Sequence, residues 1–102
     1  MSVLMEFSIF PTDQGESVSE HVSEVIRMIR ASGADYRLTA MGTIVETDEL
    51  AEALDIVERA ASVLQGRNCR RIYSAIKLDI RAGERGRLEQ KIRSVREKIG
   101  EA

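Results

Sequence analysis

The stretch Arg71-Ile72-Tyr73-Ser74-Ala75-Ile76-Lys77-Leu78-Asp79-Ile80-Arg81 alternates apolar and polar side chains, and this alternation predicts a long β-strand. One face of such a strand carries Ile72, Ile76, Leu78 and Ile80, and the other carries Tyr73, Ala75, Lys77, Asp79 and Arg81. A row of three ionisable groups and a tyrosine can bind a small polar ligand. A solvated sheet face has a similar composition, so the row alone does not decide between the two.

Three more strands are predicted upstream. In the first, Val3, Met5, Phe7 and Ile9 alternate with Leu4, Glu6, Ser8 and Phe10. Both of its rows are largely apolar, as is typical of a central strand covered on both sides. Two shorter strands are predicted over residues 36–40 and 43–47, and Met41-Gly42 forms the tight connection between them.

Helical periodicity predicts three helices between and after these strands. The first begins at Ser17, where Glu20 completes capping-box spacing, and Gly33 ends it. The second is capped by Thr47 or Asp48 and ends at Gly66. The third covers about residues 85–99. The apolar stripes of the three are Val18, Val22, Val25, Ile26 and Ile29; then Leu50, Leu54, Val57, Ala61 and Leu64; then Leu88, Ile92, Val95 and Ile99.

The order strand, helix, strand, strand, helix, strand is the split βαβ arrangement, also called ferredoxin-like. We therefore expect a single α+β domain over residues 1–102, with a four-stranded antiparallel sheet and an extra C-terminal helix. Two helices would cover one face of the sheet. The other face would stay open unless the extra helix or another subunit covers it.

Composition disfavours several classes of function. The 102 residues are 43% apolar and 31% charged, and the net charge is −2 with acids and bases interspersed. The sequence has no basic stripe that could follow a nucleic-acid backbone. An RRM has the same topology and stacks bases on aromatic residues of its central strands, but the third strand here has no aromatic residue. We expect no membrane partner, since the apolar runs are short and no signal peptide is evident. The single cysteine, Cys69, excludes an internal disulfide and fits a reducing cytoplasm.

Familiar catalytic and metal motifs are missing from the sequence. One histidine and one cysteine cannot build a zinc site. A Ser–His–Asp triad would need His21, and no nucleophile-elbow sequence surrounds it. His21 is expected to be a partly exposed helix residue, and Cys69 a small buried apolar one. Gly83-Glu84-Arg85-Gly86 has neither P-loop nor dinucleotide-binding spacing and is interpreted as a turn. We therefore expect no metal, no cofactor and no catalytic activity.

The open sheet face is the remaining candidate for chemistry. The third strand is ambiguous, since Ile44 and Glu46 share one face while Thr43 and Val45 share the other. Glu46 is assigned to the open side, because a carboxylate beneath the helices would need a partner. Two interpretations stay open: a polar pocket buried between two sheets, or structural ion pairs that fix subunit register.

Three segments resemble the family of small thiamine-binding proteins, long described as uncharacterised conserved proteins. They are Ser17-Val18-Ser19, then Met41-Gly42-Thr43-Ile44-Val45-Glu46 after Ser32-Gly33-Ala34-Asp35-Tyr36, and Ile76-Lys77-Leu78-Asp79-Ile80-Arg81. The resemblance spans nearly the whole chain. It implies a ferredoxin-like fold whose open sheets pack into homodimers or homotetramers. It also implies non-catalytic, cytoplasmic binding of thiamine or its hydroxymethylpyrimidine part.

The chemistry of thiamine suggests a role for each candidate residue. Glu46 would be the main carboxylate, with Thr43 as its hydroxyl neighbour and Asp79 as a second acid. Ser8 could bond the aminopyrimidine and Tyr73 could stack on a ring. Lys77 and Arg81 would neutralise surplus carboxylates or bind a phosphorylated vitamer. The alternative function is a structural or regulatory homo-oligomer without a ligand. An enzyme using Glu46 and Asp79 as acid and base has no supporting motif.

Overall fold

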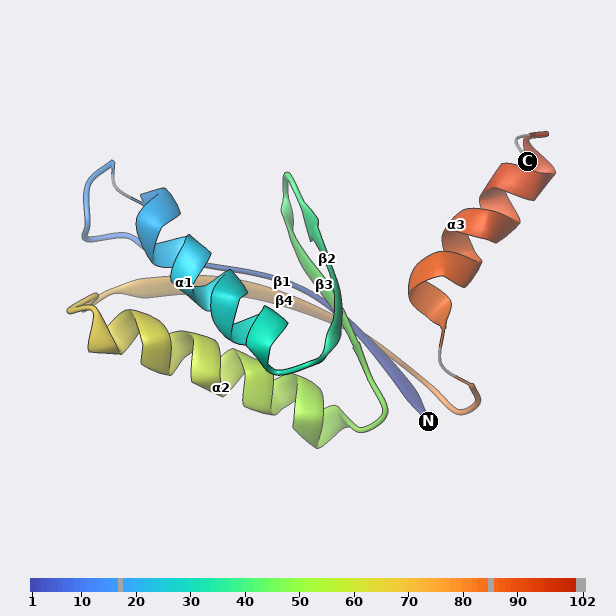
Figure 1. The fold of residues 1–102 in the computed structure, drawn as a ribbon, viewed down its shortest axis with the longest axis horizontal. Helices are drawn as coiled ribbons and strands as arrows, with labels where there is room; N and C mark the ends of the chain where they lie inside the picture. The colour runs from blue at the N-terminus through green and yellow to red at the C-terminus, as the bar shows by residue number, and fades with distance from the viewer. Residues whose placement is uncertain (17, 85, 101–102) are drawn as a thin grey trace.

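The computed structural model describes residues 1–16, 18–84 and 86–100 (Figure 1). Its sheet has the strand order β2-β3-β1-β4, and every neighbouring pair is antiparallel. The predicted ferredoxin-like α+β arrangement is therefore confirmed, including the extra C-terminal helix. The elements are β1 (Ser2–Pro11), α1 (Val18–Ala31), β2 (Asp35–Thr39), β3 (Gly42–Thr47), α2 (Leu50–Gly66), β4 (Ile72–Arg81) and α3 (Arg87–Lys98).

The core lies between the sheet and the helices α1 and α2, which Figure 1 shows on the same side of the sheet. Strand β1 supplies its centre, since Val3, Met5, Phe7 and Ile9 are each at most 7% exposed. From α1, Val25 and Ile29 pack into this row. The alternate row of β1 is half-buried on the open face.

Helix α2 turns a different stripe toward the sheet from the one predicted. Its buried residues are Ala53, Ile56, Ala60 and Leu64, whereas the predicted stripe shares only Leu64 with them. Leu54 is 46% exposed. Alanine has no long side chain to hold the helix away, so a face with two alanines can lie close against the sheet. The larger side chains of the predicted stripe consequently lie on the flank of α2.

The predicted start of α2 was also wrong by one or two residues. The N-cap is Glu49, with extended backbone angles (φ −121°, ψ 147°), and Glu49 and Glu52 form a reciprocal capping box. Thr47 instead donates its hydroxyl hydrogen bond to the Glu49 carbonyl at 2.8 Å. The prediction that Ser17 caps α1 falls on a residue outside those described.

The register between strands resolves the ambiguity of β3. Leu4 pairs with Glu46, and Phe7 pairs with Thr43. Directly paired residues share a face, so Glu46 lies on the open side, as predicted, and Thr43 lies on the helix side. The two residues are therefore on opposite faces of the sheet.

Strand β4 is less covered than its alternation implies. Its apolar residues pair with the core row of β1, yet Ile76 is 42% exposed, Leu78 41% and Ile80 50%. The helices α1 and α2 are centred over β1, so the edge of the sheet that β4 forms lies beyond them.

A tight backbone approach fixes the β2–β3 hairpin against β1. A Cβ atom added to Gly42 would lie 2.9 Å from the carbonyl oxygen of Phe7. Because the clashing atom belongs to the backbone of a central strand, it cannot move aside cheaply. Gly42 is therefore required for the first residue of β3 to pack here.

We expect Gly42→Ala to lower the free energy of unfolding by about 1–3 kcal/mol, since the hairpin must shift away from Phe7. Urea denaturation would measure the loss. The matched control is Gly66→Ala, because a Cβ there meets nothing within 4 Å. Equal stability of the two variants would contradict the proposed constraint.

Candidate functional site

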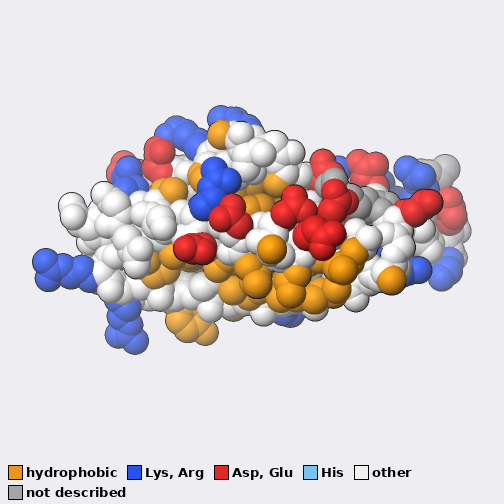
Figure 2. Space-filling view, turned by 90° about the horizontal axis from the view of Figure 1, so that it is seen from below, with side chains coloured by type: hydrophobic (Ala, Val, Ile, Leu, Met, Phe, Trp, Pro, Cys, Tyr) orange, Lys and Arg blue, Asp and Glu red, His pale blue; other side chains and the backbone are white. Residues whose placement is uncertain are grey.

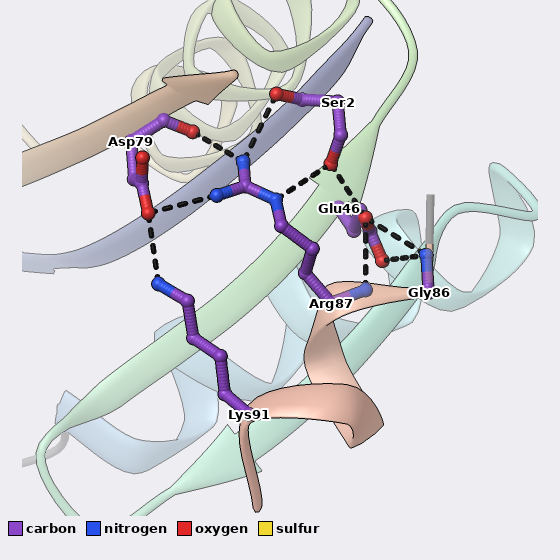
Figure 3. A network of polar contacts seen from close by, with 6 residues as sticks. All are labelled: Ser2, Glu46, Asp79, Gly86, Arg87 and Lys91. Carbon is purple, nitrogen blue, oxygen red and sulfur yellow. Dashed lines mark hydrogen bonds and ion pairs between the residues drawn. The ribbon is translucent and has the colours of Figure 1, made fainter. Parts of the chain in front are cut away.

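Glu46, the carboxylate expected to dominate the site, is 1% exposed and surrounded by hydrogen-bond donors. The hydroxyl of Ser2 donates to Glu46 Oε2 at 2.7 Å. The backbone N–H of Gly86 donates to both carboxylate oxygens at 3.1 Å, and that of Arg87 to Oε2 at 3.3 Å. Figure 3 shows this convergence of the two strands and the start of α3.

These contacts make Glu46 the cap of α3. The first N–H groups of a helix have no partner within the helix, and its N-terminus attracts negative charge. The N-cap position itself is Gly86, a residue without a side chain in a left-handed conformation (φ 98°). A carboxylate from β3 therefore satisfies donors that a local side chain would ordinarily satisfy.

The Arg87 side chain also contacts Ser2 and is only 2% exposed. Its Nε donates to Ser2 Oγ at 3.0 Å, and Nη2 donates to the carbonyls of Ser2 (3.0 Å) and Asp79 (2.7 Å). Its Nη1 lies 2.8 Å from Asp79 Oδ2, which Lys91 also contacts at 2.8 Å. We call Ser2, Glu46, Asp79 and Arg87 the Arg87 clasp. It ties the start of β1, the ends of β3 and β4, and the first turn of α3 together.

Both carboxylates of the clasp are held in the ionised form. Burial alone would raise the pKa of Glu46, but the hydrogen bonds from Ser2 and from the backbone of Arg87 and Gly86 outweigh it and lower the pKa. The pKa of Asp79 is lowered by the hydrogen bond from Lys91, with the charge of Arg87 adding to it. The hydrogen bonds of the clasp therefore favour the deprotonated form of both carboxylates.

The other predicted site residues on the open face lie away from the clasp or in separate pairs. Lys77 pairs with Glu6 at 3.0 Å. Tyr73 packs on Phe10 with ring centroids 5.6 Å apart, and the Ser8 carbonyl next to them accepts from Ser74. From Tyr73 to Asp79 the strand covers about 20 Å, so one small molecule cannot touch both. Arg81 borders a polar hollow of about 460 Å³ beside the first turn of α3.

Thr43 belongs to a different surface, a cavity of about 450 Å³ on the helix side. The register of β1 with β3 ends at the pair Phe7–Thr43, while β1 continues to Pro11. The cavity lies at this step. Besides the end of β1, from Phe7 to Phe10, its walls are Val18, Val22, Val25 and Ile26 of α1 and the hairpin residues Leu38, Thr39, Ala40, Met41, Gly42 and Thr43.

His21 is buried rather than partly exposed, which corrects the expectation for it. Its Nδ1 accepts a hydrogen bond from Arg67 Nε at 2.9 Å and lies 3.7 Å from Cys69 Sγ. Cys69 is buried, as expected, and burial raises the pKa of its thiol. In the described part of the chain, no three His, Cys, Asp or Glu side chains are grouped to hold a metal ion. No helix there has the length and hydropathy to cross a membrane.

Sequence reasoning missed Ser2 and Arg87, the two central residues of the clasp. Arg87 does carry a signal, because a cation in the first turn of a helix opposes the helix dipole. A basic residue there, directly after Gly86, indicates a role outside its own helix. Ser2 carries no comparable signal, since its burial depends on Arg87.

We expect Arg87→Met to loosen α3 while the core stays folded. Isolated helices of this length are marginal in water, so α3 depends on the clasp. Losing the charged hydrogen bonds should cost about 1–3 kcal/mol locally and raise amide exchange in α3 at least tenfold. Exposed Arg93 of the same helix provides the control, Arg93→Met, and equal exchange in both variants would argue against the clasp.

The clasp should also give α3 an acid-sensitive stability. Carboxylates with lowered pKa values stabilise the folded form fully above roughly pH 5, and the stabilisation is lost as pH falls through about 4 and below. Amide NMR shifts recorded from pH 7 to pH 3 should show that α3 detaches from the sheet at a higher pH than the one at which β1 unfolds. In Glu46→Gln this early step should largely vanish because α3 is already loosened. An α3 that persists until global unfolding would refute this expectation.

Comparison with known proteins adds close relatives. A UPF0045 protein of Mycobacterium bovis is 40% identical over 95 residues, which cover 93% of this chain and 92% of the relative. A UPF0045 protein of Methanocaldococcus jannaschii is 32% identical over 95 residues, covering 93% of each.

Solved structures share the fold over nearly their whole length. A hypothetical protein of Methanocaldococcus jannaschii aligns with a TM-score of 0.78 at 30% identity, covering 92% of this chain and 95% of that one. A Bacillus cereus domain of unknown function, DUF77, aligns at 0.82 and 28% identity, with 96% and 93% covered. The sequence model of the family described as "Thiamine-binding protein" matches residues 5–96, and the chain is a member of that family.

Proposed function

We propose that the protein binds thiamine or a related pyrimidine vitamer, such as hydroxymethylpyrimidine, in the cytoplasm and without catalysing a reaction. Membership of the thiamine-binding family supports the class of ligand, and the family description names binding rather than an activity. A free, buried Cys69 thiol suits a reducing compartment.

The observation that carries the proposal is the cavity between α1 and the β2–β3 hairpin. Its volume of about 450 Å³ lies in the range of small-molecule sites. Two of the segments that resemble the family meet there: Val18 from the start of α1, and Met41-Gly42-Thr43 from the hairpin. We therefore place the ligand in this cavity rather than between two open sheets.

The lining favours the pyrimidine half of the vitamin. Aliphatic side chains of α1 suit the faces of a flat neutral ring, and the Thr43 hydroxyl can bond a ring nitrogen or the amino group. Among the described residues, none that lines the cavity has a carboxylate, so the permanent positive charge of the thiazolium would remain at the mouth. Ser8 and Phe10, at the end of β1, also border the cavity.

The two carboxylates of the clasp could accept the ligand only after a rearrangement. Glu46 and Asp79 are both engaged by Arg87, so a cationic ligand would have to displace the first turn of α3. A phosphorylated vitamer could then contact only some of Tyr73, Lys77 and Arg81, because these residues are spaced along β4. The cavity needs no such rearrangement.

A structural or regulatory homo-oligomer without a ligand is the alternative. The exposed apolar residues of β4 favour it, because such a surface commonly marks an interface. A direct measurement of ligand binding distinguishes the two functions.

Calorimetric titration with thiamine, thiamine phosphates and hydroxymethylpyrimidine should show binding of hydroxymethylpyrimidine at least as tight as that of thiamine. Thr43→Val keeps the shape of the side chain and removes its hydroxyl, and should weaken binding about tenfold. Val22→Phe should abolish binding by filling the cavity.

The matched control is Glu46→Gln, which should leave the affinity unchanged. Weaker binding in Glu46→Gln with normal binding in Thr43→Val would move the site to the open face. No heat with any of these compounds at several temperatures would favour the oligomer without a ligand.

A further inference from the structure

The polar hollow that Arg81 borders lies beside the clasp, but its side chains belong neither to the clasp nor to the vitamin cavity. Its lining comes from the end of β4, the loop that follows and one side of α3, and includes Arg81, Ala82, Gly83, Glu84, Gln90 and Arg93. The volume of about 460 Å³ lies in the range of small-molecule sites. Two guanidinium groups from different elements therefore border one hollow of the size that a small ligand needs.

The acidic side chains around this hollow already have partners. Figure 2 shows side chains of both charges together at the end of the molecule that α3 forms. Asp79 accepts from two cations, Arg87 and Lys91, each at 2.8 Å (Figure 3). Glu89 of α3 pairs with Arg37 at 2.7 Å. These carboxylates are therefore engaged in holding α3 to the sheet.

The two arginines of the hollow are not engaged in this way. Among the described residues, none forms an ion pair with Arg81 or Arg93, and both side chains are exposed to a ligand. Glu84 is the one acidic side chain among the described residues of the lining, so positive charge is in excess there. A guanidinium group donates parallel N–H bonds to phosphate oxygens, and the Gln90 amide can donate one more.

We propose that this hollow binds the phosphate group of a small phosphomonoester, held by Arg81 and Arg93 with Gln90 as a further donor. The N–H groups at the start of α3 take no part, because Glu46 already accepts from them. The volume of the hollow leaves room for the organic part of the ligand. A phosphate ester carries nearly two negative charges at neutral pH, which suits two guanidinium groups opposed by a single carboxylate.

This site is separate from the vitamin cavity. Arg81 pairs with Ser2 in the sheet, whereas the cavity starts at Phe7, five residues farther along β1. At about 3.4 Å per residue the two lie roughly 17 Å apart along the strand, and they lie on opposite faces of the sheet. The phosphomonoester is therefore a second ligand, and its binding does not depend on the proposed function.

Occupation of the hollow would hold α3 more firmly to the sheet. Arg81 belongs to β4, whereas Gln90 and Arg93 belong to α3, so a bound phosphate joins the helix to the strand next to the Arg87 clasp. A ligand that binds only the docked helix stabilises docking by mass action. Phosphate binding and the docking of α3 are thus linked.

Inorganic phosphate is the simplest probe, titrated at constant ionic strength and followed by amide NMR shifts. The shifts should saturate and concentrate in residues 81–84 and 86–93. At ten times the Kd, amide exchange in α3 should slow about tenfold. Arg81→Gln and Arg93→Gln should each weaken binding at least tenfold, by about the loss expected for a charged hydrogen bond. The matched control is Arg70→Gln, which removes an exposed arginine before the opposite end of β4 and should leave the affinity unchanged.

Two further variants change the hollow without altering its arginines or the clasp. Glu84→Gln should tighten phosphate binding about threefold by removing a like charge, and Gln90→Glu should abolish it by adding one. An unchanged affinity in Glu84→Gln would overturn the proposal. So would equal weakening in Arg70→Gln and Arg81→Gln, or shifts that grow without saturation and appear equally with NaCl, since both indicate unspecific attraction.

A parallel titration with glycerol phosphate separates the two sources of the anion. Tighter binding of this ester than of inorganic phosphate would support an organic ligand. Equal affinity would overturn the phosphomonoester and leave free phosphate as the ligand. Calorimetry of Arg81→Gln with hydroxymethylpyrimidine should give the wild-type affinity, so that a failure at one site is distinguished from a failure at the other.

Discussion

The strict alternation of β1 is the constraint on which the rest of the structure depends. Its core row lies against α1 and α2, and through pairing it dictates which residues of β3 and β4 face the helices. A shift of one residue would send every side chain to the other face of the sheet. The placement of Thr43 in the cavity and of Glu46 in the clasp both follow from this single register.

The sequence was sufficient for the fold because the long strands have a clear period and the first two helices end at glycines, Gly33 and Gly66. The residues of β3 alone did not show which face of the strand lies against the helices, since each face carries one polar residue, Thr43 or Glu46. Only the pairing with β1 decided it. The stripe of α2 was misassigned because Leu50, Leu54 and Val57 are more apolar than Ala53 and Ala60. Closeness of approach, rather than hydrophobicity, selected the buried face.

The candidate site was harder to predict, because its contacts join residues distant in the chain. Ser2 and Arg87 are 85 positions apart, and no local pattern links them. The acidic residues expected to receive a ligand hold a helix in the protomer, while the hydroxyl expected beside them lies across the sheet. Composition identified chemically capable residues, and topology divided them between a structural clasp and an apolar cavity.

The two edges of the sheet are unequal in length. Strand β2 has five residues, whereas β4 has ten. A sheet with two long adhesive edges can add subunits indefinitely, as fibrils do. A short edge strand offers few unpaired backbone groups to another chain. The five-residue strand β2 thus protects its edge of the sheet against open-ended polymerisation.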